Sequence, residues 1–275
     1  MVYWGKGGVA VFGVREGTVK AGDKQMDYVT FGRGHRPLVM LQGLNTRGLR
    51  GSGVMLALMY RLFAKEYRVW LFDRRQQLPE GVTVRMLAED VADAMDALGI
   101  AGADVLGVSQ GGMIAQYLAI ERPDLVRRLV LALTLSRTNG VVEQVVNGWI
   151  DMTQAGDRLA LTRDMAEKMY SPAYLKRYRP LLPLWARLQW PRDPSRFVAL
   201  ARACLTCDTY NALDRITCPV MVIGAEHDLV VTGEASAEMA ERLGGSLHMY
   251  AGLGHAAYYE EAADFNRRVY DFFQA

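Results

Sequence analysis

A serine flanked by glycines is the first feature of this sequence that could do chemistry. The segment Gly107-Val108-Ser109-Gln110-Gly111-Gly112 matches the pattern G-x-S-x-G. Small neighbours allow a sharp turn from a strand into a helix, and this turn exposes the serine hydroxyl. The amino end of that helix points backbone N–H groups at the same place, where they can stabilise a developing negative charge. Ser109 is therefore predicted to be a nucleophile.

A serine hydroxyl is a poor nucleophile at neutral pH until a histidine, held by a carboxylate, takes its proton. The chain has four histidines. His255 follows two closely spaced glycines, which suit a loop that presents the ring closely, whereas His227 is adjacent to Asp228, so their side chains would point apart. His35 lies in a polar turn and His248 in an expected strand. We expect His255 to be the base and Asp228 to be the carboxylate that orients it.

Alternating strands and helices must position these three residues. Short apolar runs predict strands at 38–41, 67–72, 104–108, 129–135, 220–224 and 247–250. Longer patterns predict helices at 54–65, 86–98, 111–121, 235–243 and 258–273, and a hairpin is expected over 11–20 and 26–31. This alternation predicts an α/β fold with a mostly parallel central sheet flanked by helices. Ser109, Asp228 and His255 each follow a predicted strand.

In this order and context the three residues resemble the catalytic triad of the α/β-hydrolase fold family. Asp228 lies 228 − 109 = 119 residues after Ser109, and His255 lies 255 − 228 = 27 residues after Asp228. The resemblance extends from about Met26 to Phe273 and is weakest in the middle. It implies the α/β-hydrolase fold, with a helical lid inserted into the larger gap.

The resemblance also implies an oxyanion hole made by the backbone N–H groups of Leu44 and Gln110. In the family, a histidine and a glycine usually precede the first donor, whereas this chain has Gln42-Gly43. Because the donors are backbone groups, we expect the hole to survive the loss of that imidazole. Asn45 is expected either to add a side-chain donor in the substrate pocket or to be a solvated turn residue.

Two further segments depart from common patterns. Many relatives carry D-x-R-G-x-G-x-S after the second core strand, whereas this chain has Asp73-Arg74-Arg75-Gln76-Gln77-Leu78-Pro79. We expect a reshaped loop in which Arg74 and Arg75 form an exposed basic pair, with pairing to surface carboxylates as the alternative. A lone C-x-x-C at Cys204 and Cys207 predicts two buried thiols rather than a zinc or redox site.

The alternation of predicted strands and helices stops between about residues 139 and 210, where we expect short helices and no strands. This stretch holds five of the nine prolines and three of the five tryptophans. We expect an α/β-hydrolase core at 1–138 and 211–275 and a helical lid at 139–210, with a simple cover for the sheet edge as the alternative. Apolar residues of the lid are expected either to line the substrate pocket or to form the lid's own core: Trp149, Met152, Met169, Tyr170 and Trp185.

Composition excludes several classes of protein. With 32 basic and 30 acidic side chains among 275 residues, the net charge of +2 disfavours a dedicated nucleic-acid binder. No run reaches the roughly 18–20 apolar residues of a membrane span, and the N-terminus lacks the apolar core of a signal peptide. Three cysteines favour a reducing compartment, so we expect a cytoplasmic protein. No phosphate loop or dinucleotide motif is present, and we expect neither cofactor nor metal.

These features predict a serine hydrolase that cleaves a small or medium, mainly uncharged acyl ester through an acyl-enzyme intermediate. Its partner would be a small-molecule ester, and the apolar lid residues favour an apolar acyl or alcohol part. The same triad could instead cleave amides, peptides or lactones, or transfer acyl groups. A non-hydrolytic small-molecule receptor on this fold is the alternative from another class, because fold does not fix function.

Overall fold

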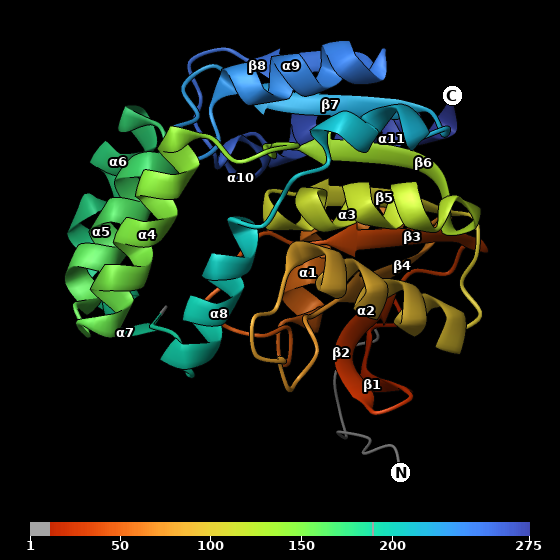
Figure 1. Ribbon diagram of the computed structural model, residues 1–275, viewed down its shortest axis with the longest axis horizontal. Coiled ribbons are helices and arrows are strands. Elements are labelled where there is room, and N and C mark those ends of the chain that lie inside the picture. Colours follow the sequence, from red (N-terminus) through yellow and green to blue (C-terminus); the bar gives the residue numbers. More distant parts are fainter. Residues whose placement is uncertain (1–11, 189) are drawn as a thin grey trace.

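An eight-stranded sheet forms the centre of the molecule (Figure 1). The structure is a computed structural model that describes residues 12–188 and 190–275. The strand order is β1-β2-β4-β3-β5-β6-β7-β8. The pairs β1–β2 and β2–β4 are antiparallel, and every other neighbouring pair is parallel. The strands are β1 Arg15–Ala21, β2 Lys24–Phe31, β3 Arg36–Leu41, β4 Tyr67–Phe72, β5 Ala103–Val108, β6 Val126–Ala132, β7 Val220–Ala225 and β8 Ser246–Tyr250.

Helices cover both faces of this sheet. Val39 and Leu41 of β3 pack into the core shared with α2, α3 and α9, whereas Leu38 and Met40 pack into the core shared with α1 and α11. Successive side chains of a strand point to opposite faces, so a strand buried on both sides is a continuous apolar run. These helices are α1 Gly53–Met59, α2 Val84–Ala97, α3 Gln110–Glu121, α9 Gly233–Leu243, α10 Ala257–Glu260 and α11 Ala262–Gln274.

Five further α-helices lie between β6 and β7, and we refer to them as the helical insertion. Figure 1 shows α4 to α7 packed together beside the sheet, with α8 returning toward it. Polar side chains cap several of them, since Asn139, Asp157 and Asp193 each accept a hydrogen bond from a backbone N–H of the first turn. The helices are α4 Gly140–Gln154, α5 Arg158–Met169, α6 Pro172–Tyr178, α7 Leu182–Leu188 and α8 Pro194–Cys204. Short 3₁₀ helices span Arg61–Phe63, Pro123–Leu125, Arg179–Leu181 and Tyr210–Arg215.

The predicted α/β architecture is confirmed, and four of its elements differ clearly in extent. The expected strand at 129–135 is β6, which ends at Ala132 because Leu133 adopts a φ of 49°. The expected helix 258–273 is divided into α10 and α11, and the expected helix 54–65 ends as α1 at Met59. The first hairpin strand was expected over 11–20 and is β1 at 15–21; residue 11 lies outside the described residues. Within the described ranges, every helix is too short or too polar to span a bilayer.

Candidate active site

Ser109 lies at the sharp turn between β5 and α3. Its backbone has φ 54° and ψ −121°, a conformation that L-residues rarely adopt. The surroundings hold it there: its N–H donates to the carbonyl of Ala132 at 2.9 Å, and its carbonyl accepts from Gly112 N at 2.8 Å and Thr134 Oγ1 at 2.8 Å. A strained residue fixed on both sides keeps its side chain in one position.

The glycines around Ser109 are required by close backbone contacts. A Cβ on Gly111 would lie 1.9 Å from the carbonyl oxygen of Leu41, at the end of β3. A Cβ on Gly107 would lie 2.5 Å from the carbonyl oxygen of Gly111. Strand β5, strand β3 and the start of α3 therefore meet without intervening side chains, which is why the motif needs glycine on both sides of the serine.

The three residues predicted to form a triad lie in one hydrogen-bonded chain. His255 Nε2 is 3.0 Å from Ser109 Oγ, and His255 Nδ1 is 2.8 Å from Asp228 Oδ2. Asp228 comes from the loop after β7 and His255 from the loop after β8, at the same edge of the sheet as Ser109. Backbone hydrogen bonds join these two loops, from Glu226 N to Tyr250 O and from His227 N to Leu253 O.

Asp228 lies where its carboxylate is stabilised as an anion. It is only 5% exposed, and its Oδ1 accepts hydrogen bonds from Val230 N at 2.8 Å and Val231 N at 3.0 Å. Burial alone would raise the pKa of Asp228, but the charge and hydrogen bond of His255, together with the two N–H groups, hold this pKa below its usual range. An ionised Asp228 can orient the His255 ring and stabilise its protonated form.

The other histidines lie away from this chain of contacts. His227 is exposed, although it neighbours Asp228 in sequence, and His35 is also exposed. His248 packs edge-on against Tyr250, with the ring centroids 4.6 Å apart. Of the two histidines beside the expected acid loop, His255 is therefore the one that reaches Ser109.

The loop expected to supply an oxyanion donor passes directly beside the serine. A Cβ on Gly43 would lie 3.2 Å from Ser109 Cβ and 3.6 Å from its Oγ. Gln110 is the first residue of α3, so its N–H has no acceptor within its own helix. Gly43, the residue before Leu44, thus contacts Ser109, the residue before Gln110, and the role of Leu44 and Gln110 as donors stays a prediction.

A small cavity opens next to these residues. Its volume is about 180 Å³, and it lies between the loop Gln42–Asn45, helix α1 and the segment after His255. Methionine, leucine and tyrosine side chains form most of its wall, with Asn45 at the loop side: Met40, Met55, Leu56, Met59, Tyr60, Leu106, Tyr258 and Tyr259. The space is smaller than the 300–1,000 Å³ of sites for drug-sized ligands, so it suits a small apolar group.

Of the residues expected to line a substrate pocket, Asn45 lines this cavity and the other five do not line it themselves. The indole N–H of the buried Trp149 donates to Asp164 at 2.8 Å. Met152 and Met169 pack against the core on the α2 and α3 side. Tyr170 stacks on Tyr174 at 4.7 Å and packs edge-on against Tyr259 of the cavity wall, with the ring centroids 6.2 Å apart. Trp185 stacks on Tyr178 at 5.9 Å. A pocket role for these five residues stays a prediction.

The cavity-lining residues of α1 were missed by the sequence analysis. Helix α1 has the sequence GVMLALM and exposes Met55 and Leu58 by 63% and 48% of their surfaces. A surface helix normally keeps one polar face, so a short helix that is apolar all round was the available signal. Met55 and Met59 of this helix border the cavity.

The helical insertion is tied to the histidine loop by three hydrogen bonds. Ala256 N donates to Met169 O at 2.7 Å. Ser171 N and Oγ donate to the two carboxylate oxygens of Glu260, at 2.8 and 2.5 Å. His255 is therefore held from one side by Asp228 and from the other by the junction of α5 and α6.

Comparison with known proteins assigns the fold family. A model of the alpha/beta hydrolase fold matches residues 36–262, well over half of the chain. The chain belongs to the α/β-hydrolase fold family. The resemblance predicted from the order of Ser109, Asp228 and His255 is thereby confirmed, as is the fold that it implied.

Several α/β hydrolases are similar over most of their length. A Caulobacter protein proposed to be a carbamate hydrolase, RutD, is 29% identical over 248 residues, covering 82% of this chain and 87% of its own. The 3-oxoadipate enol-lactonase 2 of Acinetobacter baylyi is 24% identical over 257 residues, covering 92% and 94%. Among solved structures, the enol-lactonase of Burkholderia xenovorans has a TM-score of 0.81 at 23% identity, covering 94% of this chain and all of its own. The relatives support a hydrolase.

The loop after β4 is where this α/β hydrolase departs from expectation. Arg74 was expected to be exposed and is only 4% exposed. Burial lowers the pKa of the Arg74 guanidinium, although an arginine side chain stays protonated in proteins. The Arg75 side chain is 13% exposed, and its Nε lies 3.2 Å from the buried carboxylate of Asp90. The expected exposed basic pair is therefore wrong, because both guanidinium groups find oxygen partners inside the fold.

The cysteines are three free thiols. Cys204 and Cys207 are buried and Cys218 is partly buried. Burial raises the pKa of the Cys204 thiol to about 11, and the Cys204 sulfur accepts a hydrogen bond from Gln110 Nε2 at 3.1 Å. Within residues 12–188 and 190–275, no group of three potential metal ligands could hold an ion.

Proposed function

We propose that this α/β hydrolase is a serine hydrolase that cleaves small or medium, mainly uncharged acyl esters through an acyl-enzyme intermediate. The observation that carries the proposal is the continuous chain from Ser109 Oγ through the His255 ring to the buried Asp228 carboxylate. The strained backbone of Ser109 supports it, because such strain persists only where the surrounding structure over-determines it, often at active sites.

In the proposed first half-reaction, Ser109 Oγ attacks the ester carbonyl while its proton passes to His255 Nε2. Asp228 stabilises the resulting imidazolium through Nδ1. The carbonyl oxygen becomes negative and accepts hydrogen bonds from the N–H groups of Leu44 and Gln110. The tetrahedral intermediate collapses, His255 gives its proton to the leaving alcohol, and the acyl group stays on Ser109.

In the second half-reaction, His255 takes a proton from water, and the hydroxide attacks the acyl carbon. The same donors hold the second oxyanion. Collapse of the intermediate breaks the bond to Ser109 Oγ, which regains its proton from His255, and the acid product leaves. The cycle consumes one ester and one water molecule and regenerates the three side chains.

The cavity of about 180 Å³ supports a small acyl or alcohol part. Its walls are mainly methionine, leucine and tyrosine side chains, so burying an uncharged apolar group there is favourable. We further propose that the helical insertion, within residues 139–210, acts as a lid, which its contacts with the histidine loop at Met169 and Ser171 support. Three free cysteines support a cytoplasmic location.

The test is turnover of p-nitrophenyl acetate together with labelling by a fluorophosphonate probe. Ser109→Ala should abolish labelling and reduce turnover at least about 10³-fold, and His255→Ala should reduce turnover similarly. His227→Ala is the matched control, because His227 neighbours Asp228 but is exposed, and it should keep wild-type activity. Full activity in Ser109→Ala, or a wild-type protein that takes no label, would refute the proposal.

A lactone hydrolase is the second candidate. The similarity to the enol-lactonase of Acinetobacter baylyi favours it, because that relative covers 92% of this chain. A lactone is a cyclic ester, so the same attack and collapse apply, with the leaving alcohol retained in the product. A series of model esters of increasing acyl length, with amides and lactones included, separates the two candidates by kcat/KM. Tight binding of these compounds without turnover would instead indicate a receptor.

A further inference from the structure

Arg74 joins the two segments that flank the proposed oxyanion hole. Its Nη2 donates to the carbonyl oxygen of Gln42 at 2.6 Å, two residues before Leu44. Its Nε and Nη2 donate to the Gln110 side-chain oxygen at 3.2 and 3.0 Å. Leu44 and Gln110 carry the two expected N–H donors, so one guanidinium connects the segments that must keep both donors at a fixed separation.

The Gln110 side chain is in turn fixed from the opposite side. Its Nε2 donates to Leu200 O at 2.6 Å and to Cys204 Sγ at 3.1 Å, both in α8. Gln110 is 1% exposed, so its amide cannot exchange these partners for water. The contacts of Gln110 with Arg74 and with α8 together fix the first residue of α3, which directly follows the nucleophile.

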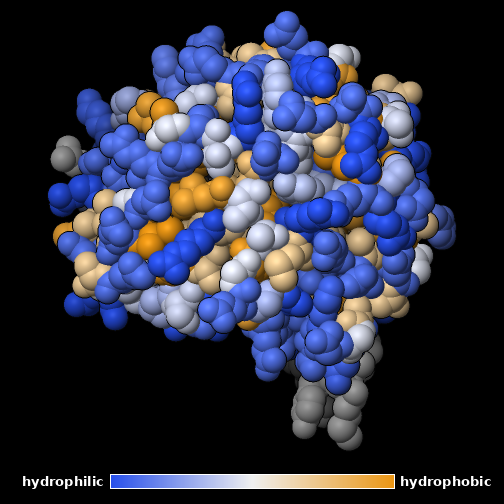
Figure 2. Space-filling model, in the orientation of Figure 1, coloured by the Kyte–Doolittle hydropathy of each residue, from blue (hydrophilic) through white to orange (hydrophobic). Residues whose placement is uncertain are grey.

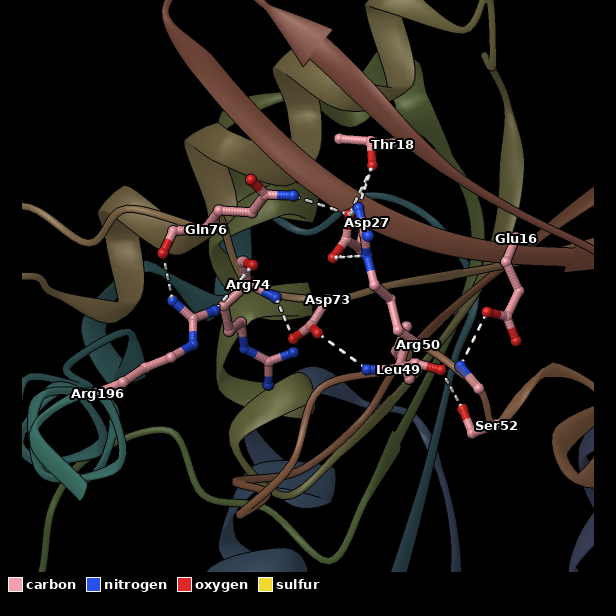
Figure 3. Close-up of polar contacts among 11 residues, drawn as sticks. Glu16, Thr18, Asp27, Leu49, Arg50, Ser52, Asp73, Arg74, Gln76 and Arg196 are labelled. Atoms are coloured by element: carbon pink, nitrogen blue, oxygen red, sulfur yellow. Dashed lines mark hydrogen bonds and ion pairs between the residues drawn. The ribbon is translucent and has the colours of Figure 1, made fainter. Parts of the chain in front are cut away.

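The loop that carries Arg74 is itself anchored from two sides, by hydrogen bonds of which several appear in Figure 3. Asp73 Oδ2 accepts a hydrogen bond from Leu49 N at 3.0 Å. Arg196 of α8 donates to the carbonyl oxygens of Arg74, Arg75 and Gln76, at 3.0, 2.7 and 3.0 Å. Because this loop is held in place, the Arg74 guanidinium can fix the positions of Gln42 and Gln110.

The support of the loop before Leu44 differs here from the pattern that the family usually shows. The sequence here has glutamine where relatives usually have a histidine before the first donor. Gln42 presents its backbone carbonyl to Arg74, which supports the loop through the main chain instead of through an imidazole. A planar guanidinium is suited to this task, because it holds several donors in one rigid fork.

We propose that Arg74 is a positioning residue that sets the separation of the Leu44 and Gln110 N–H groups in the oxyanion hole. This inference rests on the proposed function. Arg74 acts through Gln42 and Gln110 rather than through the substrate. Removing one oxyanion donor costs about 10²–10³-fold in kcat. Loosening two donors without removing either should cost less, about 10–100-fold, and should leave KM nearly unchanged because ground-state binding does not use them.

The experiment compares Arg74→Met, Arg74→Lys and the matched control Arg75→Met. Methionine keeps the length of the side chain without its donors, and lysine keeps the charge without the fork. Arg75 lies in the same loop but contacts Asp90 instead. The readouts are kcat and KM for p-nitrophenyl acetate, the Kd of phenylboronic acid as a tetrahedral analogue, and Tm. Both Arg74 variants should lose 10–100-fold in kcat, with a parallel weakening of the boronate, whereas Arg75→Met should change neither.

If Arg74→Met does not fold, Gln110→Met breaks the same connection from the other side and should give the same split between kcat and KM. The inference is overturned if Arg74→Lys restores kcat, which would show that charge alone suffices. It is also overturned if Tm falls while kcat and the boronate Kd stay at wild-type values, which would indicate a merely structural role. A wild-type protein without turnover or fluorophosphonate labelling would refute the proposed function instead, so the two failures are distinguishable.

Discussion

The close contact of Gly111 with strand β3 makes one substitution informative. An ideal Cβ at this position lies 1.9 Å from Leu41 O and 2.7 Å from Gln42 O, and both are backbone atoms. A side chain could rotate away, but a carbonyl group can move only with its strand. Real Cβ contacts essentially never fall below 3.0 Å, so Gly111→Ala must separate β3 from α3 by at least 3.0 − 1.9 = 1.1 Å.

This separation has a stability cost and a catalytic cost. Overpacking a well-filled site costs about 1–3 kcal/mol, and a backbone obstacle places Gly111→Ala near the upper end, at about 3 kcal/mol. The displaced carbonyls precede Leu44, so the proposed oxyanion donor moves by a similar distance relative to Ser109. A misplacement of about 1 Å can cost about 10²-fold in rate. We therefore expect kcat to fall about 100-fold in the fraction that remains folded.

The assay combines urea unfolding at 25 °C with ester turnover. Gly148→Ala is the matched control, because Gly148 lies within α4 and a Cβ there meets nothing within 4 Å. The same substitution should stabilise the protein by about 0.5–1 kcal/mol at this position, since alanine favours helix over glycine. If Gly111→Ala unfolds at the same urea concentration as the wild type and keeps its kcat, the argument from close packing is refuted.

Three further predictions concern the acid loop and the thiols. Asp228→Asn should lower kcat about 10³–10⁴-fold, as expected when the histidine loses its orienting anion. Because the pKa of Asp228 is held low in the folded state, its contribution to stability is complete above the unfolded pKa of about 3.9 and is lost as pH falls through the folded value. Urea unfolding between pH 5 and 3 should thus show a shallower acid dependence in Asp228→Asn, and equal slopes would contradict this. In the native protein a thiol reagent should modify only Cys218, and slowly, because partial burial raises the pKa of its thiol. In urea all three thiols should react. Rapid modification of Cys204 or Cys207 in the native protein would contradict their burial.

The architecture could be predicted from the sequence because each of its physical requirements restricts the residue types at neighbouring positions of the chain. Strands β3 and β5 are buried on both faces, and each is a short apolar run of the kind that is typical of such strands. The turn at Ser109 is even easier to recognise in the sequence. Glycine is the only residue type that the close backbone contacts at positions 107 and 111 allow. Such constraints act within a few residues of chain, and a sequence pattern records them directly.

The parts that were missed depend on contacts between distant segments. Arg74 meets its partners 32 and 36 residues away, at Gln42 and Gln110, and a charged residue is normally expected at the surface. The division between α10 and α11 has no glycine or proline to mark it, although Glu260 there reaches Ser171 of the helical insertion. The apolar side chains of the insertion share the composition of a pocket wall, and only the folded arrangement shows that Trp149 bonds to Asp164.

The conformation of Ser109 also affects how this protein would respond to selection. A φ of 54° costs a residue with a side chain about 1–3 kcal/mol, and glycine adopts such angles freely. Ser109→Gly would therefore remove the proposed nucleophile and raise the melting temperature at once, whereas Ser109→Ala would keep the strain. A directed-evolution library screened for heat resistance alone would enrich inactive proteins at this position. Selection for thermal tolerance in this enzyme must be coupled to a measurement of turnover.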